Sequence, residues 1–422
     1  MSSALPSYEQ AAALVADYAA KLSRLRPPAA RVDLDLAAGR VLARPLCADR
    51  DQPPFTRSTR DGFACLALEA STHGLLDLVG VSRAGEAPAG PLPPGAAWEI
   101  MTGAPVPAGA DAVVMSEHVK VAEKQLRLRP PRKVKPGENV VVQGAQARRG
   151  DELLAAGTAI RFPQIALAAA CGYAAIDVFV RPRVAILTTG DELVPVDSSP
   201  APGKIRNSNA PMLAAMVAAA GGEPWVLPTA ADHAQSLDRA LAQAAEADLL
   251  LISGGVSAGK FDLVEPALAR AGARFHFTGV RIQPGKPLVF GELPVRNVHA
   301  VQKENGTKCF FGLPGNPVSS AVTFLLFAAP VLAALAGSLE PSPRFALARL
   351  ATKANKHGKK GLTRFLPASC TFSAAAGRLP EVALVPTHGS GDLAALARSN
   401  CFLVPEDDHG LKTGTTVRIL LF

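Results

Sequence analysis

The run Val184-Ala185-Ile186-Leu187-Thr188-Thr189-Gly190-Asp191-Glu192 joins a short apolar segment to a polar one. Such an apolar segment is typical of a buried strand in a parallel α/β sheet, where ligands bind beyond the carboxyl ends of the strands. Thr189 and Gly190 would let a phosphate approach the backbone, and the carboxylates of Asp191 and Glu192 suit a hard cation such as Mg²⁺. A plain acidic helix start is the alternative, because negative side chains favour a helix N-terminus.

A second apolar strand is predicted at Leu249 to Ile252, before the loop Ser253-Gly254-Gly255-Val256-Ser257-Ala258-Gly259-Lys260-Phe261-Asp262. A glycine-rich loop between a strand and a helix can present several backbone N–H groups to an anion. It is not a Walker A motif, because the Gly-Lys-Ser/Thr ending is missing. A tight connection without a ligand is the alternative.

A third loop, Gly312-Leu313-Pro314-Gly315-Asn316-Pro317-Val318-Ser319-Ser320, opens a long predicted helix. Its prolines stiffen the turn, and the helix would direct free N–H groups toward the same edge of the sheet. Upstream, Gln283-Pro284-Gly285-Lys286-Pro287 places a lysine on a stiff turn. A single surface lysine usually has no role, but beside three anion-type loops Lys286 becomes a candidate oxyanion ligand.

The rest of the chain divides around this α/β segment. Residues 7–25 predict an amphipathic helix with a capping box of Ser7 and Gln10, and residues 151–178 are rich in Ala and Leu at helical spacing. In the rest of the chain, short β-type runs alternate with Gly/Pro turns, and this pattern predicts strands. The predicted fold class is multidomain, with a central α/β domain of parallel or mixed sheet, a β-rich N-terminal domain and a C-terminal β domain. The predicted boundaries are 1–47 with 147–178 for a helical linker domain, 48–146 for the β-rich domain, 179–338 for the α/β domain and 339–422 for the C-terminal domain.

Composition narrows the possible functions. A chain of 422 residues is too long for a single hydrophobic core, so we expect several domains. The net charge is +8. Aromatic residues make up only 5%, and no basic run is interleaved with them, so we expect no nucleic-acid binding. The most apolar stretch, Ala321 to Ala336, contains Pro330 and is short for a membrane span, so we expect a buried helix and no membrane association. Six cysteines without a C-x-x-C pair, and an N-terminus without a signal-peptide pattern, favour a cytoplasmic protein with free thiols.

Further short motifs complete an ordered set. They are Asp61-Gly62-Phe63-Ala64, Ile100-Met101-Thr102-Gly103-Ala104-Pro105-Val106-Pro107, Gly109-Ala110-Asp111-Ala112-Val113-Val114, Gly389-Ser390-Gly391-Asp392-Leu393 and Asn400. Together with Thr189 to Leu193, Gly254 to Ser257, Pro284 to Pro287 and Leu313 to Pro317, they resemble the MoeA and gephyrin E-domain family of molybdopterin molybdenumtransferases. Each motif is ambiguous alone, but the ordered set is specific and covers nearly the whole chain.

This resemblance implies a molybdopterin-binding α/β domain and a homodimer in which one subunit's β-rich domain faces the other's α/β cleft. It implies insertion of molybdenum from molybdate into adenylyl-molybdopterin, with release of AMP and with Mg²⁺ as the cofactor. Other molybdenum-cofactor biosynthesis proteins are expected partners. The residues carried over are catalytic Asp61, Thr102, Glu192 and Asp262, substrate-binding Thr189, Gly190, Ser257, Lys286, Pro314, Ser319 and Arg364, and metal-binding Asp191, Glu192, Asp232 and Asp262.

The sequence departs from the family pattern at several positions. Arg57-Ser58-Thr59-Arg60 precedes Asp61 where many members have Asn-Ser-x-Met, and Gln283 stands where many have lysine. Pro367 and Ala394-Ala395 stand where many have arginine and two serines. The last three departures remove polar groups near the expected oxyanion site, where Arg364 is a candidate replacement for the arginine.

Two other functions stay open at this point. One is an adenylyltransferase or nucleotide pyrophosphatase built on the related α/β domain, although such single-domain enzymes lack the regions 48–146 and 339–422. The other is a non-enzymatic scaffold, since E-domains can also cluster partners. The acidic set favours retained chemistry, and a calorimetric test of AMP and molybdate binding would separate a scaffold from an enzyme.

Overall fold

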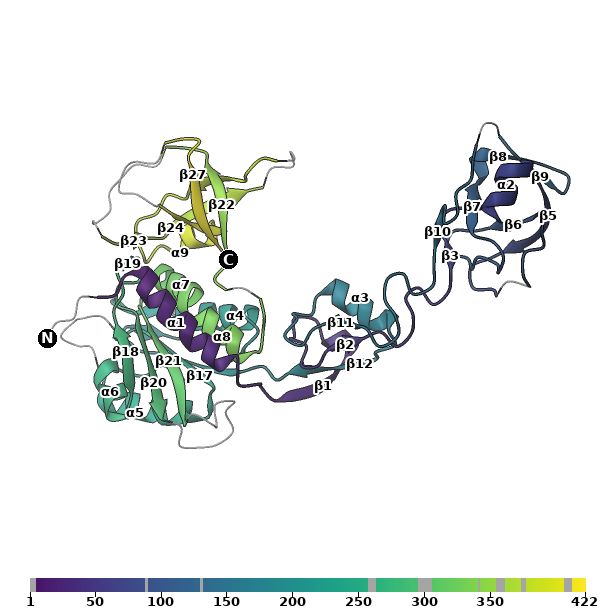
Figure 1. The fold of residues 1–422 in the computed structure, drawn as a ribbon. Helices are drawn as coiled ribbons and strands as arrows, with labels where there is room; N and C mark the ends of the chain where they lie inside the picture. Colours follow the sequence, from purple (N-terminus) through teal and green to yellow (C-terminus); the bar gives the residue numbers. More distant parts are fainter. Residues whose placement is uncertain are drawn as a thin grey trace. The chain divides into compact units, whose positions relative to one another are not determined.

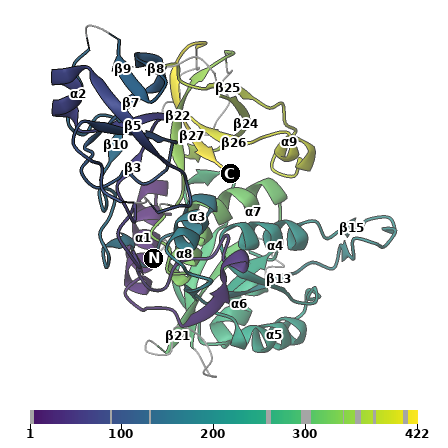
Figure 2. The same ribbon diagram turned by 90° about the vertical axis from the view of Figure 1, so that its right-hand side faces the viewer.

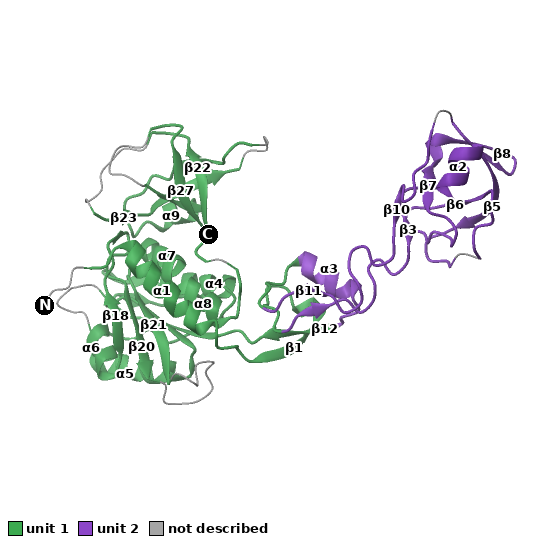
Figure 3. Cartoon of the chain, viewed as in Figure 1, with its two compact units in different colours: residues 1–43, 157–161, 175–422 green, residues 44–156, 162–174 purple. Residues whose placement is uncertain are grey.

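The computed structural model describes residues 5–87, 90–129, 132–256, 263–294, 306–340, 342–353, 361–372, 377–405 and 412–422. The chain forms two compact units (Figure 3). The larger unit consists of Met1–Ala43, Gly157–Arg161 and Ala175–Phe422, and the smaller of Arg44–Ala156 and Phe162–Ala174. The finer division into four domains stays a prediction.

The larger unit is built around a six-stranded sheet with the order β16-β13-β17-β21-β20-β18. Figure 1 labels β17, β18, β20 and β21 of this sheet, and Figure 2 labels β13. The first four strands in this order are parallel, and β20 and β18 are antiparallel to their neighbours. The sheet therefore confirms the predicted mixed α/β class. Its strands are β13 (Arg183–Thr188), β16 (Glu223–Val226), β17 (Leu249–Ser253), β18 (Arg274–Thr278), β20 (Val289–Pro294) and β21 (Thr307–Leu313).

Helices cover both faces of this sheet, because alternate residues of its inner strands point to opposite sides. Val184 and Ile186 of β13 belong to the core that contains residues of α1, α4, α7 and α8. Ala185 and Leu187 belong to the core that contains residues of α5 and α6. The helices are α1 (Tyr8–Leu22), α4 (Asn209–Ala219), α5 (Ala234–Gln243), the 3₁₀ turn η3 (Ala244–Glu246), α6 (Val264–Arg270), α7 (Pro317–Thr323) and α8 (Ala329–Leu335).

Helix α1 begins as its sequence predicts. The Gln10 N–H donates to Ser7 Oγ at 3.2 Å, and the Ser7 N–H donates to Gln10 Oε1 at 2.9 Å, which is the expected capping box. Ala11 and Val15 are buried in the core of the α/β sheet. The helix thus packs on the central sheet, although the predicted boundaries place it in a linker domain. Its apolar face closes one side of the α/β core.

One long apolar helix lies inside this core. Helix α7, the π-helical turn η4 (Phe324–Ala328) and α8 run without a break from Pro317 to Leu335. The helix is long and apolar enough to cross a membrane, but 83% of its apolar window is buried inside the protein, as predicted for a core helix. Pro330 does not interrupt this helix. Pro330 lies in the first turn of α8, directly after the wide π turn, where a residue without an N–H donor is tolerated.

The C-terminal part confirms the predicted β domain. Five strands close into a barrel with the order β22-β25-β24-β26-β27. They are β22 (Phe345–Leu350), β24 (Leu366–Thr371), β25 (Glu381–Leu384), β26 (Cys401–Val404) and β27 (Thr416–Leu421). Short elements complete the larger unit: β1 (Ala29–Asp33), η1 (Leu34–Leu36), β12 (Ala175–Phe179), β14 (Leu193–Val194), β15 (Ile205–Arg206), β19 (Ile282–Gln283), β23 (Thr363–Arg364) and α9 (Leu393–Ala397).

The smaller unit confirms the predicted β-rich region. A six-stranded sheet with the order β7-β4-β6-β5-β9-β8 forms its body. Its strands are β4 (Gly62–Cys65), β5 (Leu75–Ser82), β6 (Ala96–Ile100), β7 (Ala112–Met115), β8 (Val119–Ala122) and β9 (Gln125–Leu128). The remaining elements are β2 (Leu46–Cys47), β3 (Arg57–Ser58), α2 (Ala67–His73), η2 (Ser116–His118), β10 (Val140–Val141), β11 (Glu152–Leu154) and α3 (Phe162–Ala170).

The helical prediction for residues 151–178 is only partly right. Within it only Phe162–Ala170 is helical, and the strands Glu152–Leu154 and Ala175–Phe179 flank this helix. Both strands pair with segments more than a hundred residues earlier in the chain: Glu152 lies opposite Cys47, and Ala175 opposite Asp33. A short apolar run does not reveal such partners, because periodicity alone does not separate a short strand from a helix.

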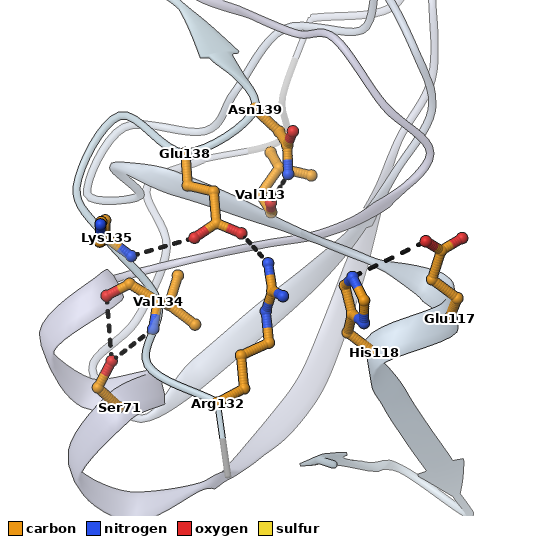
Figure 4. Close-up of polar contacts among 9 residues, drawn as sticks. All are labelled: Ser71, Val113, Glu117, His118, Arg132, Val134, Lys135, Glu138 and Asn139. Carbon is orange, nitrogen blue, oxygen red and sulfur yellow. Dashed lines mark hydrogen bonds and ion pairs between the residues drawn. The ribbon is translucent and has the colours of Figure 1, made fainter. Parts of the chain in front are cut away.

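Polar contacts fix the segment that precedes β10 in the smaller unit (Figure 4). Arg132 forms an ion pair with Glu138. The Val134 N–H donates to Ser71 Oγ at 2.9 Å, and the Ser71 hydroxyl donates to Val134 O at 3.1 Å. Asn139 Nδ2 donates to a backbone oxygen of β7 at 2.8 Å. The segment is thereby tied to both α2 and the sheet.

Candidate functional site

Two of the predicted acidic residues meet at the carboxyl edge of the central sheet. The Asp232 N–H donates to Asp191 Oδ1 at 3.0 Å, and the Asp191 N–H donates to Asp232 Oδ2 at 3.3 Å. Both residues are exposed. Asp191 follows β13 and Asp232 follows the neighbouring parallel strand β16, so their loops emerge at the same edge. This reciprocal pair, Asp191 and Asp232, is called the acidic pair below.

The other two predicted metal ligands are not placed with the acidic pair. The Glu192 carboxylate lies against Gly190, where a Cβ atom would come within 2.6 Å of Glu192 Oε1. Asp262 and Ser257 lie outside the described residues. Within the described part of the chain, no three His, Cys, Asp or Glu side chains form a group suited to a metal ion. The four-carboxylate set therefore stays a prediction.

The loops after β13 and β17 touch at Thr189. Its N–H donates to Ser253 O at 3.0 Å. Gly254 has a φ of +96°, and a Cβ atom there would lie 2.5 Å from Thr189 O, so glycine is required at this contact. Thr189 is 4% exposed, and its Oγ1 has no hydrogen-bond partner among the described residues. The predicted substrate-binding threonine thus stands at the junction of two loops.

The third loop is held by the C-terminal barrel. Asn316 Nδ2 donates to Ser390 Oγ at 2.9 Å, and the Val318 N–H donates to Ser390 O at 3.0 Å. Pro314 is buried at the start of the turn, and Ser319 in the first turn of α7 is 4% exposed. The motif at Gly389 to Leu393 therefore supports the loop that carries two predicted substrate-binding residues.

The predicted oxyanion residues lie where the barrel meets the α/β part. Strand β19 pairs in parallel with β23 and sets Gln283 opposite Arg364. Arg364 Nε is buried without a hydrogen-bond partner within the described residues. Lys286 is exposed on the turn after β19. An arginine therefore lies beside Gln283, the position where many family members have lysine.

The other two departures from the family pattern have structural partners. Pro367 is buried in β24, and its oxygen accepts from the Val385 N–H at 2.9 Å. Asp392 caps α9 by accepting from the Ala395 N–H at 2.9 Å. Backbone N–H donors from Ala395 and His388 hold the pKa of the Asp392 carboxyl below its usual value. The capping bond needs only the backbone of residue 395, which an alanine supplies.

Asp61 and Thr102 form one site in the smaller unit. Strands β4 and β6 are antiparallel with Gly62 opposite Ile100, so the residues just before Gly62 and just after Ile100 meet at one end. The Thr102 N–H and hydroxyl both donate to Asp61 Oδ1, at 2.7 and 2.9 Å. These donors, the N–H first, hold the pKa of Asp61 below its usual value, because they stabilise the ionised carboxyl.

Sequence patterns alone missed two polar residues at the sheet edge. Asn209 Nδ2 donates to Ser253 Oγ at 2.9 Å and to Gly315 O at 2.7 Å, so it joins the loops after β17 and β21. Lys204 Nζ donates to Asp191 O at 2.6 Å. An asparagine at the start of a predicted helix is ordinarily taken as a cap, and an isolated lysine carries no signal. Their roles follow from long-range contacts.

Known proteins match this chain over nearly its whole length. Three family models match in order: the MoeA N-terminal region (domain I and II) at residues 6–172, a probable molybdopterin binding domain at 185–334 and the MoeA C-terminal region (domain IV) at 348–422. Molybdopterin molybdenumtransferases from Nostoc sp. and Staphylococcus aureus (strain Mu50) are 35% and 34% identical to it. These matches cover 92% and 93% of this chain and 88% and 91% of the relatives. The crystal structure of the molybdopterin biosynthesis MoeA protein from Pyrococcus horikoshii OT3 has a TM-score of 0.78 at 28% identity, over 99% of this chain and 100% of that one. The protein therefore belongs to the MoeA family of molybdopterin molybdenumtransferases.

Proposed function

We propose that this protein inserts molybdenum from molybdate into adenylyl-molybdopterin and releases AMP. Its family membership extends over all its parts, including those that single-domain adenylyltransferases lack. The observation that carries the proposal is the acidic pair, Asp191 and Asp232, beside two glycine- and proline-rich loops at the carboxyl edge of the sheet. Carboxylates and anion-type loops together suit a metal-assisted reaction of a phosphate compound.

Both proposed substrates are anions, so the site must supply donors and positive charge. The remaining backbone N–H groups of the loops after β17 and β21 would supply donors, since the Gly254 N–H is already bonded to Leu313 O and the Val318 N–H to Ser390 O. Lys286 and Arg364 offer two cations around the β19–β23 pair, and Ser319 offers a hydroxyl. We assign molybdate, a tetrahedral dianion, to this basic side and the nucleotide phosphates to the glycine loops.

Mg²⁺ fits the acidic pair as the proposed cofactor. Mg²⁺ in proteins commonly takes one or two carboxylates and completes its shell with water and substrate phosphate oxygens, so two exposed carboxylates suffice. Asp191 and Asp232 would hold it, and their mutual backbone hydrogen bonds would keep both carboxylates oriented. When bound, the ion neutralises charge on the phosphoanhydride that is cleaved.

We further propose that the protein acts as a homodimer in the cytoplasm, with other molybdenum-cofactor biosynthesis proteins as partners. The family resemblance supports the dimer, in which Asp61 and Thr102 would serve the α/β site of the other subunit. Asp61 would then act as an ionised carboxylate, because its two Thr102 donors favour that form. No disulfide joins the six cysteines, all of which are described, and this agrees with a reducing compartment.

The proposal is tested by incubating the purified protein with adenylyl-molybdopterin, Mg²⁺ and molybdate and measuring AMP. We expect AMP release that increases with molybdate and that Asp232→Asn lowers by about 100-fold, a typical effect of removing one electrostatic group from an active site. Asp238→Asn is the matched control. This exposed carboxylate on α5 pairs with Arg270 at 2.9 Å, and its loss should leave the rate unchanged.

Other outcomes would favour the alternative functions. An adenylyltransferase would consume ATP with molybdopterin and form the adenylylated compound, without a molybdate requirement. A scaffold would release no AMP and would bind neither AMP nor molybdate in calorimetry. Either result would contradict the proposed transferase reaction.

A further inference from the structure

Asn209, the first residue of α4, links two of the three loops at the carboxyl edge of the sheet. Its Nδ2 donates to Ser253 Oγ at 2.9 Å and to Gly315 O at 2.7 Å. We propose that Asn209 is a positioning residue that aims the Ser253 hydroxyl as a hydrogen-bond donor at a phosphate oxygen of the bound substrate. This inference rests on the proposed function, because it assigns nucleotide phosphate to this edge.

The direction of these hydrogen bonds follows from the donor and acceptor inventory. A backbone carbonyl only accepts, so the amide nitrogen of Asn209 must face Gly315 O. The same nitrogen then donates its second hydrogen to Ser253 Oγ, which acts as an acceptor in this contact. The hydrogen of the Ser253 hydroxyl is thereby left to point away from Asn209. Ser253 is 2% exposed, so the local packing restricts that direction.

Unused polar atoms at this junction indicate a ligand. Asn209 Oδ1 and Thr189 Oγ1 are both buried, and neither has a hydrogen-bond partner among the described residues. Buried polar atoms in proteins are nearly always hydrogen-bonded, so these two atoms call for missing partners. The Thr189 hydroxyl can donate to a phosphate oxygen, whereas Asn209 Oδ1 only accepts and needs a donor, such as a water molecule bound to the substrate. Thr189 is 4% exposed, and its N–H donates to Ser253 O at 3.0 Å, which brings it to the same strand end.

The chemistry of the junction selects the ligand class. The hydroxyls of Ser253 and Thr189 can donate, whereas the Gly254 N–H is already bonded to Leu313 O at 3.2 Å. Hydroxyl donors at the start of a glycine loop suit phosphate oxygens. The nearby acidic pair would repel a phosphate unless a cation lies between them, which agrees with Mg²⁺ on Asp191 and Asp232.

The test combines substitutions at both positions with two measurements. Asn209→Ala and Ser253→Ala should each weaken AMP binding in calorimetry by about tenfold and raise the KM for adenylyl-molybdopterin similarly. The KM for molybdate should change less than about twofold, because molybdate is assigned elsewhere. Adding Asn209→Ala to Ser253→Ala should cause little further loss, since Asn209 acts through Ser253. Ser253→Thr keeps the hydroxyl and should restore AMP affinity to near the wild-type value.

Asn400→Ala separates positioning from simple loss of stability. Asn400 also makes two side-chain hydrogen bonds to backbone, accepting from Cys370 N at 2.7 Å and donating to Cys370 O at 2.9 Å, but within the barrel. We expect it to lower the unfolding temperature without changing AMP affinity. If Asn209→Ala does not fold, Asn209→Ser, which retains one donor, is measured in its place with the same expectation of weakened AMP binding.

Two results would overturn the inference. One is an AMP affinity that Asn209→Ala, or its serine replacement, changes no more than Asn400→Ala does. The other is a full additional loss from the Asn209 substitution in the Ser253→Ala background, which would mean independent action. If AMP binding responds as expected but no molybdate-dependent AMP release occurs in the wild type, the transferase proposal fails and the positioning role of Asn209 stands.

Discussion

Asp61 in the smaller unit and Asp191 in the larger unit are both held by backbone N–H groups, but their neighbours differ. Asp61 receives two donors from the single residue Thr102, at 2.7 and 2.9 Å. Asp191 exchanges hydrogen bonds with a second carboxylate, Asp232, at 3.0 and 3.3 Å. The two Thr102 donors stabilise the single negative charge of Asp61. Two adjacent carboxylates concentrate negative charge that a cation can neutralise.

The contrast arises from strand direction. In the smaller unit, antiparallel β4 and β6 bring the start of one strand to the end of the other. In the larger unit, parallel β13 and β16 deliver both of their following loops to the same edge. The end of this antiparallel strand pair thus carries one oriented carboxylate, whereas the parallel edge carries two. We infer that Asp61 orients substrate and that the acidic pair binds Mg²⁺.

The largest expected effect tests whether the two carboxylate sites serve one reaction. Asp61→Ala and Asp232→Ala should each reduce AMP release by about 100-fold or more. After subunit exchange, a mixture of the two variants should recover part of the activity, because each heterodimer retains one complete site. Mixing Asp191→Ala with Asp232→Ala is the control and should recover nothing, since both changes lie in the same pair. Absence of recovery with proven exchange would place both carboxylates in a site within one subunit.

The second prediction separates the cation role from the orienting role. Asp191→Asn should raise the Mg²⁺ concentration for half-maximal AMP release by about tenfold, since one carboxylate ligand is lost. Asp61→Asn should lower the maximal rate without shifting the Mg²⁺ requirement. The measurement is a Mg²⁺ titration of both variants. Equal shifts in both would remove the distinction between the two sites.

The third prediction concerns Lys286, which we assign to molybdate and not to Mg²⁺ or the nucleotide. Lys286→Ala should raise the molybdate concentration for half-maximal rate by about tenfold, roughly 1.4 kcal/mol, while AMP affinity changes far less. Lys286→Arg should rescue only partly, because a planar guanidinium does not reproduce a compact ammonium. Lys120→Ala, an exposed lysine on β8, is the matched control. A molybdate titration without a shift for Lys286→Ala would move the oxyanion site toward Arg364.

The smallest expected effect concerns the pKa of Asp61. Thr102→Val removes the hydroxyl donor and keeps the N–H, so the pKa of Asp61 should rise part of the way toward its usual value. The depressed folded pKa means that this bond adds stability above the unfolded pKa, and that the contribution is lost as pH falls through the folded pKa. An NMR titration of the Asp61 carboxyl in both proteins measures the shift. An unchanged pKa would assign the whole effect to the Thr102 N–H.

Local sequence determined the elements that burial and backbone chemistry specify directly. The capping box at Ser7, the apolar strand at Val184 to Leu187 and the glycine- and proline-rich loops were all predicted, because each depends on a few adjacent residues. The ordered motifs identified the family, and the candidate site residues were taken from its pattern. The same local signals failed for residues 151–178, where strand partners lie far away in the chain.

Tertiary structure alone decided which polar residues meet. Asp191 and Asp232 are 41 residues apart, and Asn209 reaches a loop 106 residues away. Residue spacing along one strand or helix is set by its period, but contacts between loops depend on strand order and register. Strand order and register depend in turn on which side chains are buried across the entire sheet. The carboxylates and the loops could therefore be predicted from the sequence. Only the fold shows that Asp191 contacts Asp232 and that Asn209 joins Ser253 to Gly315.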